Sequence, residues 1–370
     1  MPRPIKKGHH PDYFFLALIF IITVFGLVML TSASSELGKI KFNDSYYYLK
    51  HQIYNGFIIG IIGFIIASKI NYQRYKKLAL ILLIASLGIL ALVFTNLGVT
   101  SGGATRWLDL GPIRFQPAEL LKISFILYLG SWLGNQRINR ARSFSEGFLP
   151  LLIIYGATAA LIFFQRSTSM AVIILGAGTI VYFLSGAKLK YLFYLFIIGA
   201  VVLSALIYLT PYRLQRVVSF LNSGNDPLRS DYHLNEAKTA IGSGGIFGVG
   251  YGESRTKAAF LPAPIDDSIF AVTAEELGFI GGGALVALFG TLVIKMLLMA
   301  RKIRDQFGQL LLIGFASVIG IQSLIHVGAI SGVLPLTGVP LPFISYGGTA
   351  LAVFLIMSGI SLNVSKYTQN

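Results

Sequence analysis

The sequence contains no cysteine and has few charged residues for its length. Of its 370 residues only 12% are charged, and 30 basic side chains stand against 15 acidic ones. Without cysteine there is no disulfide, no thiolate nucleophile and no cysteine-based metal site. The five histidines are scattered and show no HExxH spacing, which argues against a zinc site. Soluble domains carry about 25% charged residues, so the composition also argues against a soluble protein.

Apolar residues are abundant instead, at 55% of the chain with a mean hydropathy of +0.72. Apolar stretches of about 17–25 residues, the length of a transmembrane helix, recur along the whole sequence. We therefore expect an all-α, polytopic integral membrane protein that forms one membrane domain over residues 1–370. Ten transmembrane helices are predicted, at residues 13–32, 52–68, 78–95, 118–134, 148–164, 170–186, 191–210, 268–299, 307–332 and 341–365.

The basic residues are unevenly distributed between the predicted loops. If the N-terminus is cytoplasmic, Lys and Arg are concentrated in the cytoplasmic segments and sparse in the short outer loops. This asymmetry fits the positive-inside rule and predicts that both termini are cytoplasmic. The basic residues behind the net charge of +15 then set the membrane topology and contact anionic lipid headgroups. No nucleic-acid partner is expected.

One outer segment, residues 211–267, is much longer than the others and lies between the seventh and eighth predicted spans. Its start, YRLQRVVSFLNSGNDPL, has apolar residues at helical spacing, which predicts a helix on the membrane surface. A second short helix is expected at His233–Ile241. The glycine-rich stretch IGSGGIFGVGYG matches no nucleotide-binding pattern and is interpreted as flexible backbone at the membrane surface or a loop that approaches phosphate.

Two charged residues fall inside the fourth predicted span. Glu119 and Lys122 are three residues apart, so they share one helix face and are close enough to pair. Ionisable groups at this depth are costly and are functional candidates by default. Two interpretations are left open, a structural ion pair and the lining of a polar cavity.

The loop before this span, SGGATRWLDLGPIRFQP, carries Arg106 and Arg114. Arginines at a membrane surface commonly extend toward lipid headgroups. The alternative is a phosphate clamp, since guanidinium groups bind phosphate oxygens in a fork.

The stretch FLPAPIDDSIFAVTAEELGFIGG places four carboxylates close together at the start of the eighth span. One of Asp266, Asp267 and Ser268 is expected to cap the helix. A cap explains one Asp, and the second could act as a base at the outer surface. Glu275 and Glu276 lie deeper and are expected to be structural, with Lys122 as a candidate partner.

The segment HVGAISGVLPLTGVPLPFISYGGTA interrupts the helical pattern with several prolines and glycines near the outer end of the last two spans. Irregular backbone at this depth is tolerated where protein or a water-filled cavity covers it. The segment is therefore predicted to form the wall of a polar cavity that opens outward.

Three stretches together, SGGATRWLDLGPIRFQPAELLK, AIGSGGIFGVGYGESRTKAAFLPAPIDDSIFAVTAEELGFIGG and GVLPLTGVPLPFISYGGTA, resemble the SEDS family (shape, elongation, division and sporulation). The resemblance extends from the first span to the last and leans toward the FtsW type rather than the RodA type. It implies polymerisation of lipid II into peptidoglycan strands on the outer face of the bacterial cytoplasmic membrane, for cell division or cell-shape growth. The implied partners are lipid II, the undecaprenyl-linked glycan, membrane lipids and a class B penicillin-binding protein.

The resemblance also implies roles for individual residues. The essential aspartate of the family maps to Asp267, with Asp266 beside it; the basic pair of the outer loop maps to Arg106 and Arg114, the charged pair of the fourth span to Glu119 and Lys122, and the serine of the last signature to Ser345. The chain departs from the family pattern at Gln165–Ser167, where an aspartate is missing, and at Ile265 and His326.

These residues lead to a mechanistic hypothesis. Polymerisation inverts the configuration at C1 of the donor sugar, so one base must activate the acceptor 4-hydroxyl, and Asp267 is the candidate. Arg106, Arg114 and Ser345 would bind the pyrophosphate, or a divalent cation such as Mg²⁺ or Mn²⁺ would neutralise it. The sequence identifies no metal ligands.

Two other functions fit the same residues. A lipid II flippase or transporter would need a path to both membrane faces and no base at the surface. A non-catalytic scaffold for the penicillin-binding protein would tolerate the loss of the Asp267 carboxylate.

Overall fold

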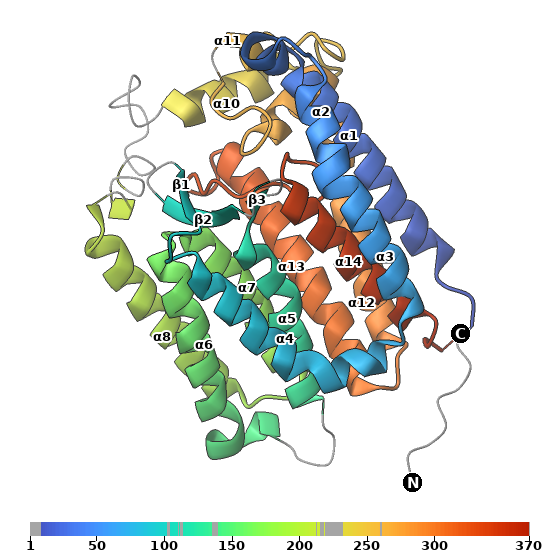
Figure 1. Ribbon diagram of the computed structural model, residues 1–370, viewed down its shortest axis with the longest axis vertical. Helices are drawn as coiled ribbons and strands as arrows, with labels where there is room; N and C mark the ends of the chain where they lie inside the picture. The colour runs from blue at the N-terminus through green and yellow to red at the C-terminus, as the bar shows by residue number, and fades with distance from the viewer. Residues whose placement is uncertain are drawn as a thin grey trace.

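The computed structural model describes residues 9–101, 104–109, 111, 114–134, 140–211, 213–214, 218, 232–259 and 261–369. Its helices run side by side along one direction and form a bundle (Figure 1). The elements are α1 (Tyr13–Phe42), α2 (Tyr47–Gln52), the π-helix Ile53–Ile58, α3 (Ile59–Lys69), α4 (Tyr72–Leu92), β1 (Gly98–Ser101), β2 (Ala104–Asp109), β3 (Arg114–Phe115), α5 (Pro117–Leu133), the 3₁₀ turn Arg140–Arg142, the π-helix Phe144–Phe148, α6 (Leu149–Phe164), α7 (Thr168–Leu184), α8 (Leu189–Tyr208), α10 (Tyr232–Ser243), α11 (Thr256–Ala259), α12 (Ile269–Arg301), α13 (Gln306–Ile330) and α14 (Gly348–Ser365).

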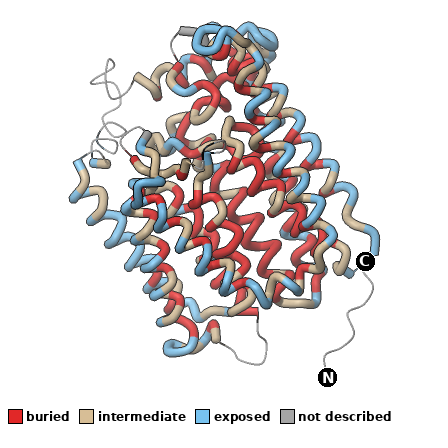
Figure 2. Tube along the Cα trace, viewed as in Figure 1, coloured by how far each residue is buried: buried red, intermediate tan, exposed pale blue. Residues whose placement is uncertain are grey.

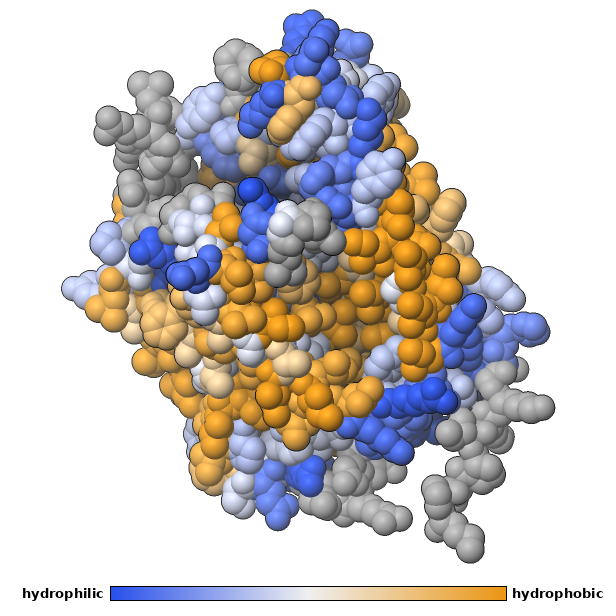
Figure 3. Space-filling model, in the orientation of Figure 1, coloured by the Kyte–Doolittle hydropathy of each residue, from blue (hydrophilic) through white to orange (hydrophobic). Residues whose placement is uncertain are grey.

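Within the described residues, eight helical segments are long and apolar enough to cross a membrane. The helices α5 and α7 lie in the same bundle but are shorter, at 17 residues each. The surface has an apolar band between two polar ends, as expected for a bundle surrounded by lipid (Figure 3). The all-α, multi-pass fold is therefore confirmed, while the count of ten spans stays a prediction.

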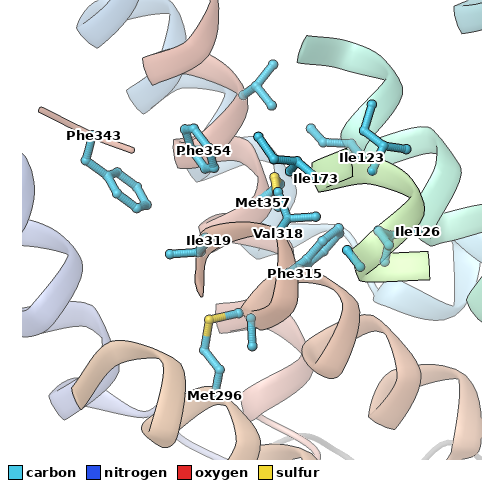
Figure 4. Close-up of a cluster of buried hydrophobic side chains, with 14 of the residues drawn as sticks. Ile123, Ile126, Ile173, Met296, Phe315, Val318, Ile319, Phe343, Phe354 and Met357 are labelled. Carbon is cyan, nitrogen blue, oxygen red and sulfur yellow. The ribbon is translucent and has the colours of Figure 1, made fainter. Parts of the chain in front are cut away.

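The helices α13 and α14 form the centre of the bundle. In their most apolar windows 72% and 89% of the residues are buried, against 11% in α8 at the periphery (Figure 2). Aromatic and branched side chains meet between the central helices (Figure 4), with Ile123 from α5, Ile173 from α7, Phe315 from α13 and Phe354 from α14. This packing holds the two helices that flank the proline-rich segment 331–347.

Small residues on α14 allow it to approach the π-helix Ile53–Ile58 and α3 closely. A Cβ added at Gly348 would lie 2.7 Å from the Asn55 carbonyl oxygen, and one at Gly359 would lie 2.5 Å from the Phe64 carbonyl oxygen. Helix pairs in membranes use such small residues because the backbones themselves then come into contact.

Several boundaries differ from the sequence-based prediction. The last helix begins at Gly348, so residues 341–347 of the predicted tenth span are a loop. The segment 98–115 contains a three-stranded antiparallel sheet of order β1-β2-β3, which was not predicted. The predicted surface helix after residue 211 lies largely outside the described residues, whereas the second short helix is observed as α10.

The helix α12 is broken near its first third, where Gly278 adopts φ +69° and ψ −169°. The glycine-rich loop after α10 runs alongside this break and supplies hydrogen bonds to it. The amide of Val249 donates to the Glu275 carbonyl (3.0 Å), and the amide of Phe279 donates to the Gly245 carbonyl (2.8 Å). A side chain at Gly248 would collide with the Glu276 carbonyl oxygen, so the glycines permit this backbone-to-backbone contact.

Candidate functional site

The two adjacent aspartates lie in the turn that leads into α12. Ser268 occupies the N-cap position, but its side chain makes no capping hydrogen bond, and its hydroxyl donates to the Pro262 carbonyl instead (2.8 Å). The Nε2 atom of His233 lies 2.7 Å from the same hydroxyl oxygen and joins α10 to the turn. Of the three cap candidates, Ser268 therefore occupies the N-cap position.

The loop before α14 holds the aspartate turn in place. The Ser345 hydroxyl donates to the Asp266 carbonyl (2.7 Å) and accepts from the Leu341 amide (2.8 Å). The Tyr346 amide donates to the Ile265 carbonyl (2.9 Å). Ser345 is thus brought together with the aspartates, and its contacts fix the backbone of their turn. Binding of pyrophosphate by Ser345 stays a prediction.

The two aspartates are both partly buried and have different neighbours. Burial, and then the charge of Asp267, raise the pKa of Asp266 to about 7. Burial, and then the charge of Asp266, raise the pKa of the Tyr346 phenol. A Cβ on Gly338, where φ is +63°, would lie 3.3 Å from Oδ2 of Asp267, so that carboxylate lies directly beside the glycine backbone. Asp266 therefore carries a proton more readily than an ordinary aspartate.

Glu119 and Lys122 form a fully buried ion pair in α5. The Lys122 Nζ lies 2.9 and 2.8 Å from the two Glu119 oxygens and also donates to Oε1 of Gln322 (2.7 Å). The amide of Gln322 in turn donates to the Pro340 carbonyl (2.8 Å). The pair is thus connected to the loop that places Gly338 beside Asp267. Sequence reasoning missed Gln322, although a glutamine inside an apolar span was the available signal.

The same face of α13 carries further buried polar groups next to this loop. Nδ1 of His326 lies 2.6 Å from the Val339 carbonyl oxygen. Its Nε2 and the Ser323 hydroxyl are buried and have no hydrogen-bond partner among the described residues. Buried polar atoms of this kind normally have partners, so their presence is consistent with the predicted polar cavity wall.

Glu275 and Glu276 are buried and bind the segment that precedes the aspartate turn. Glu275 accepts hydrogen bonds from the Ser254 hydroxyl (2.6 Å), from the Thr256 hydroxyl and from the Arg255 amide (3.1 Å). Glu276 pairs with Lys257 of α11 (2.7 Å). The expectation that Lys122 would be their partner is wrong, because Lys122 already pairs within α5 and Lys257 is brought to Glu276 by the loop.

Arg106 and Arg114 lie in the small sheet. The Nη2 atom of Arg106 donates to the Arg166 carbonyl at the end of α6 (2.7 Å), and Ser169, at the start of α7, donates to the Thr337 carbonyl beside Gly338 (3.1 Å). These contacts follow the rim of the bundle from Arg106 to the loop that touches Asp267.

Arg114 is largely exposed and lies 3.5 Å from Asp109. Its carbonyl lies 3.5 Å from the Thr349 hydroxyl, at the start of α14. The strand β3 is thereby attached to the helix that follows the Ser345 loop. A phosphate-binding role for Arg106 and Arg114 stays a prediction.

No group of three or more His, Asp or Glu side chains with metal-site geometry occurs within the described ranges. A cation held mainly by substrate phosphates needs only one or two carboxylates. A role for Mg²⁺ or Mn²⁺ stays a prediction.

Comparison with known proteins identifies the family. A family model described as FtsW/RodA/SpoVE, cell cycle protein, matches residues 12–370. The chain is 34% identical over 365 residues to stage V sporulation protein E of Bacillus subtilis, covering 98% of this chain and 99% of the relative. It is 35% identical over 363 residues to the probable peptidoglycan glycosyltransferase FtsW of Geobacter metallireducens, covering 98% and 96%.

Solved structures agree with this result. A chain of a peptidoglycan synthase complex, in which polymerisation and crosslinking are coordinated, superposes with a TM-score of 0.80 at 27% identity, covering 97% of this chain and 99% of that one. The rod shape determining protein RodA of Thermus thermophilus superposes with a TM-score of 0.72 at 28% identity, covering 97% and 98%. The fold, the full-length family match and the sequence identity therefore agree that this chain belongs to the FtsW/RodA/SpoVE family of membrane proteins.

Proposed function

We propose that this chain is a peptidoglycan glycosyltransferase that polymerises lipid II into glycan strands, in cell division or cell-shape growth. The placement of the Asp267 carboxylate is the observation that supports the proposal most directly. This carboxylate lies beside Gly338, in a turn fixed by Ser345 from the loop before α14 and by His233 from α10. A carboxylate held in this way at the polar end of a membrane bundle can meet a sugar whose lipid anchor lies in the bilayer.

In the proposed reaction, the acceptor 4-hydroxyl attacks C1 of the donor sugar while Asp267 removes its proton. The bond from C1 to the lipid pyrophosphate breaks, and the α-linked donor becomes a β-linked product. General-base assistance contributes roughly 10²–10⁴-fold to such a step. Asp266 supports this assignment because its raised pKa of about 7 keeps it partly protonated near neutral pH, which lessens the repulsion between the two adjacent carboxyl groups.

The departing pyrophosphate carries the negative charge released in the reaction. Arg106 and Arg114, on the sheet that is tied to the same rim, would stabilise this charge. A divalent cation bound to the pyrophosphate would supply the same stabilisation. Both assignments belong to the proposal.

We further propose that the site faces the outside of the bacterial cytoplasmic membrane, that both termini are cytoplasmic, and that a class B penicillin-binding protein crosslinks the product. The basic residues at the opposite end of the bundle support this orientation. A synthase complex that coordinates polymerisation with crosslinking contains a chain of the same fold, which supports the partner.

The test is a gel assay for glycan polymer with purified chain, lipid II and the partner. Wild type should form polymer, whereas Asp267→Asn should form none while it remains folded and inserted. Polymer from Asp267→Asn at the wild-type rate would overturn the assignment. Transfer of labelled lipid II across liposomes without any polymer would instead identify a flippase.

A further inference from the structure

The glycine-rich loop beside the α12 break exposes a group of large apolar side chains. Phe247 and Ile246 are 81% and 62% exposed, and their neighbours on α12, Phe279 and Ile280, are 77% and 53% exposed. The loop and helix are joined here, because the Ile280 amide donates to the Ile246 carbonyl (3.2 Å). Together these four residues form an apolar patch. Contacts between α1 and α12 indicate where this patch lies relative to the membrane.

The helices α1 and α12 are joined at two levels. At one end of the bundle Lys295 pairs with Asp12 (2.6 Å), and at the other end the Ser32 hydroxyl donates to Glu276 (2.5 Å). At a rise of about 1.5 Å per residue, the two levels are about 30 Å apart along α1 and about 28 Å apart along α12. Neither helix has a charged residue between them. This spacing equals the hydrocarbon thickness of a bilayer, about 30 Å, so the two contacts mark its boundaries.

The apolar patch lies on the hydrocarbon side of the Ser32–Glu276 level. Ile280 is about one turn beyond Glu276 toward the Lys295 end of α12. The Tyr251 hydroxyl, at the other end of the loop, donates to the Val28 carbonyl (2.9 Å), which is one turn of α1 below Ser32. Both ends of the loop therefore reach past the boundary.

The charge pattern of the loop agrees with this position. Residues 244–252 contain no charged side chain, and the next residue is the exposed Glu253. The buried Lys257 donates to both Ser32 and Glu276 at the boundary level itself (2.9 and 2.7 Å). The chain thus changes from apolar to charged at the level where hydrocarbon gives way to headgroups.

We propose that Ile246, Phe247, Phe279 and Ile280 insert into the leaflet on the Asp267 side and anchor the long loop to the lipid. Exposed apolar groups of this size mark a membrane or protein contact. The lipid is favoured because the patch continues the lipid-facing surface of α12 and lies below the boundary. Since the same loop is bonded to Glu275 and Glu276, the anchor also sets the distance of the aspartate turn from the bilayer.

The absence of native cysteine allows a direct test. Phe247→Cys, labelled with an environment-sensitive NBD dye, is reconstituted without any partner into phosphatidylcholine–phosphatidylglycerol nanodiscs. We expect short-wavelength emission and strong quenching by lipids that carry a nitroxide near the start of the acyl chain. Glu253→Cys, labelled in the same way, is the matched control and should show water-like emission with quenching by aqueous iodide.

Because Phe247 is so exposed, its replacement should leave the fold intact, which an unchanged Tm checks. Water-like emission and iodide quenching at position 247 would overturn the proposal. So would apolar emission that lipid nitroxides do not quench, since the side chain would then pack against protein. A label that becomes apolar only after the penicillin-binding partner is added would also overturn it and identify a protein contact.

Discussion

Two pairs of adjacent acids occupy one segment of the chain, and their surroundings are opposite. Glu275 and Glu276 are buried, and they accept hydrogen bonds from hydroxyl, amide and ammonium groups of the preceding loop. Asp266 and Asp267, nearer the polar end, are partly buried. Among the residues that the structure describes, no cation pairs with the Asp266 carboxyl, whose pKa is raised. Carboxylates with strong partners stabilise the fold, whereas a carboxyl group without a cation is available to exchange protons.

The largest expected effect compares the same amide substitution in the two pairs. Asp267→Asn should lower the polymerisation rate by roughly 10²–10⁴-fold, because the acceptor hydroxyl then has no base. Glu275→Gln should lower Tm, because hydrogen bonds to a charged group contribute about 1.5–3 kcal/mol each. Polymer gels and thermal unfolding of both variants provide the measurement. The comparison fails if Glu275→Gln leaves Tm unchanged or Asp267→Asn leaves the polymerisation rate unchanged.

The next largest effect concerns Lys257, the cation that pairs with Glu276. Lys257→Met leaves the Glu276 carboxylate buried without its partner, which should cost about 3–5 kcal/mol. The double variant Lys257→Met with Glu276→Gln should recover much of this loss, because position 276 then carries no unpaired buried charge. Lys69→Met, at an exposed position, is the control. Equal stability of the single and double variants would show that the buried charge is not the cause.

A smaller effect should appear as a pH dependence of stability. In the folded state the pKa of Asp266 is about 7, whereas in the unfolded chain its pKa returns to the ordinary value of 3.8. The contribution of Asp266 to stability is therefore present at low pH and is lost as the pH rises from about 4 through 7. Asp266→Asn should remove this loss and stabilise the protein at about pH 8 by roughly 2–4 kcal/mol. Parallel Tm profiles of wild type and variant between about pH 5 and 8 would contradict this.

The smallest expected effect on stability lies on the rim. The Arg114–Asp109 pair is exposed, so Arg114→Gln should change stability by less than about 1 kcal/mol. A lower polymerisation rate at unchanged Tm would support a role at the pyrophosphate. An unchanged rate would indicate that Arg114 contacts only lipid headgroups. Asp109→Asn is the control, because it breaks the same ion pair and keeps the Arg114 guanidinium.

The sequence-based prediction succeeded where the signal was local. Glu119 and Lys122 pair as their three-residue spacing indicated, and α10 lies where its helix was expected. The prediction failed where partners come from distant segments. Lys257 and Gln322 were missed, since nothing in the spacing along the chain links them to Glu276 or Lys122. The three short strands were also missed, because each is stabilised mainly by pairing with its neighbours.

The sequence by itself determined that this is a multi-pass helical membrane protein, and it located the acids and arginines of the candidate site. Hydrophobic length and charge placement are enough for this, because the bilayer imposes them on every span. Only the tertiary structure decided that Glu276 binds Lys257, that Ser345 fixes the aspartate turn and that α12 breaks at Gly278. These features depend on which segments meet in the packed bundle, and hydrogen bonds between distant residues leave no periodic pattern in the chain.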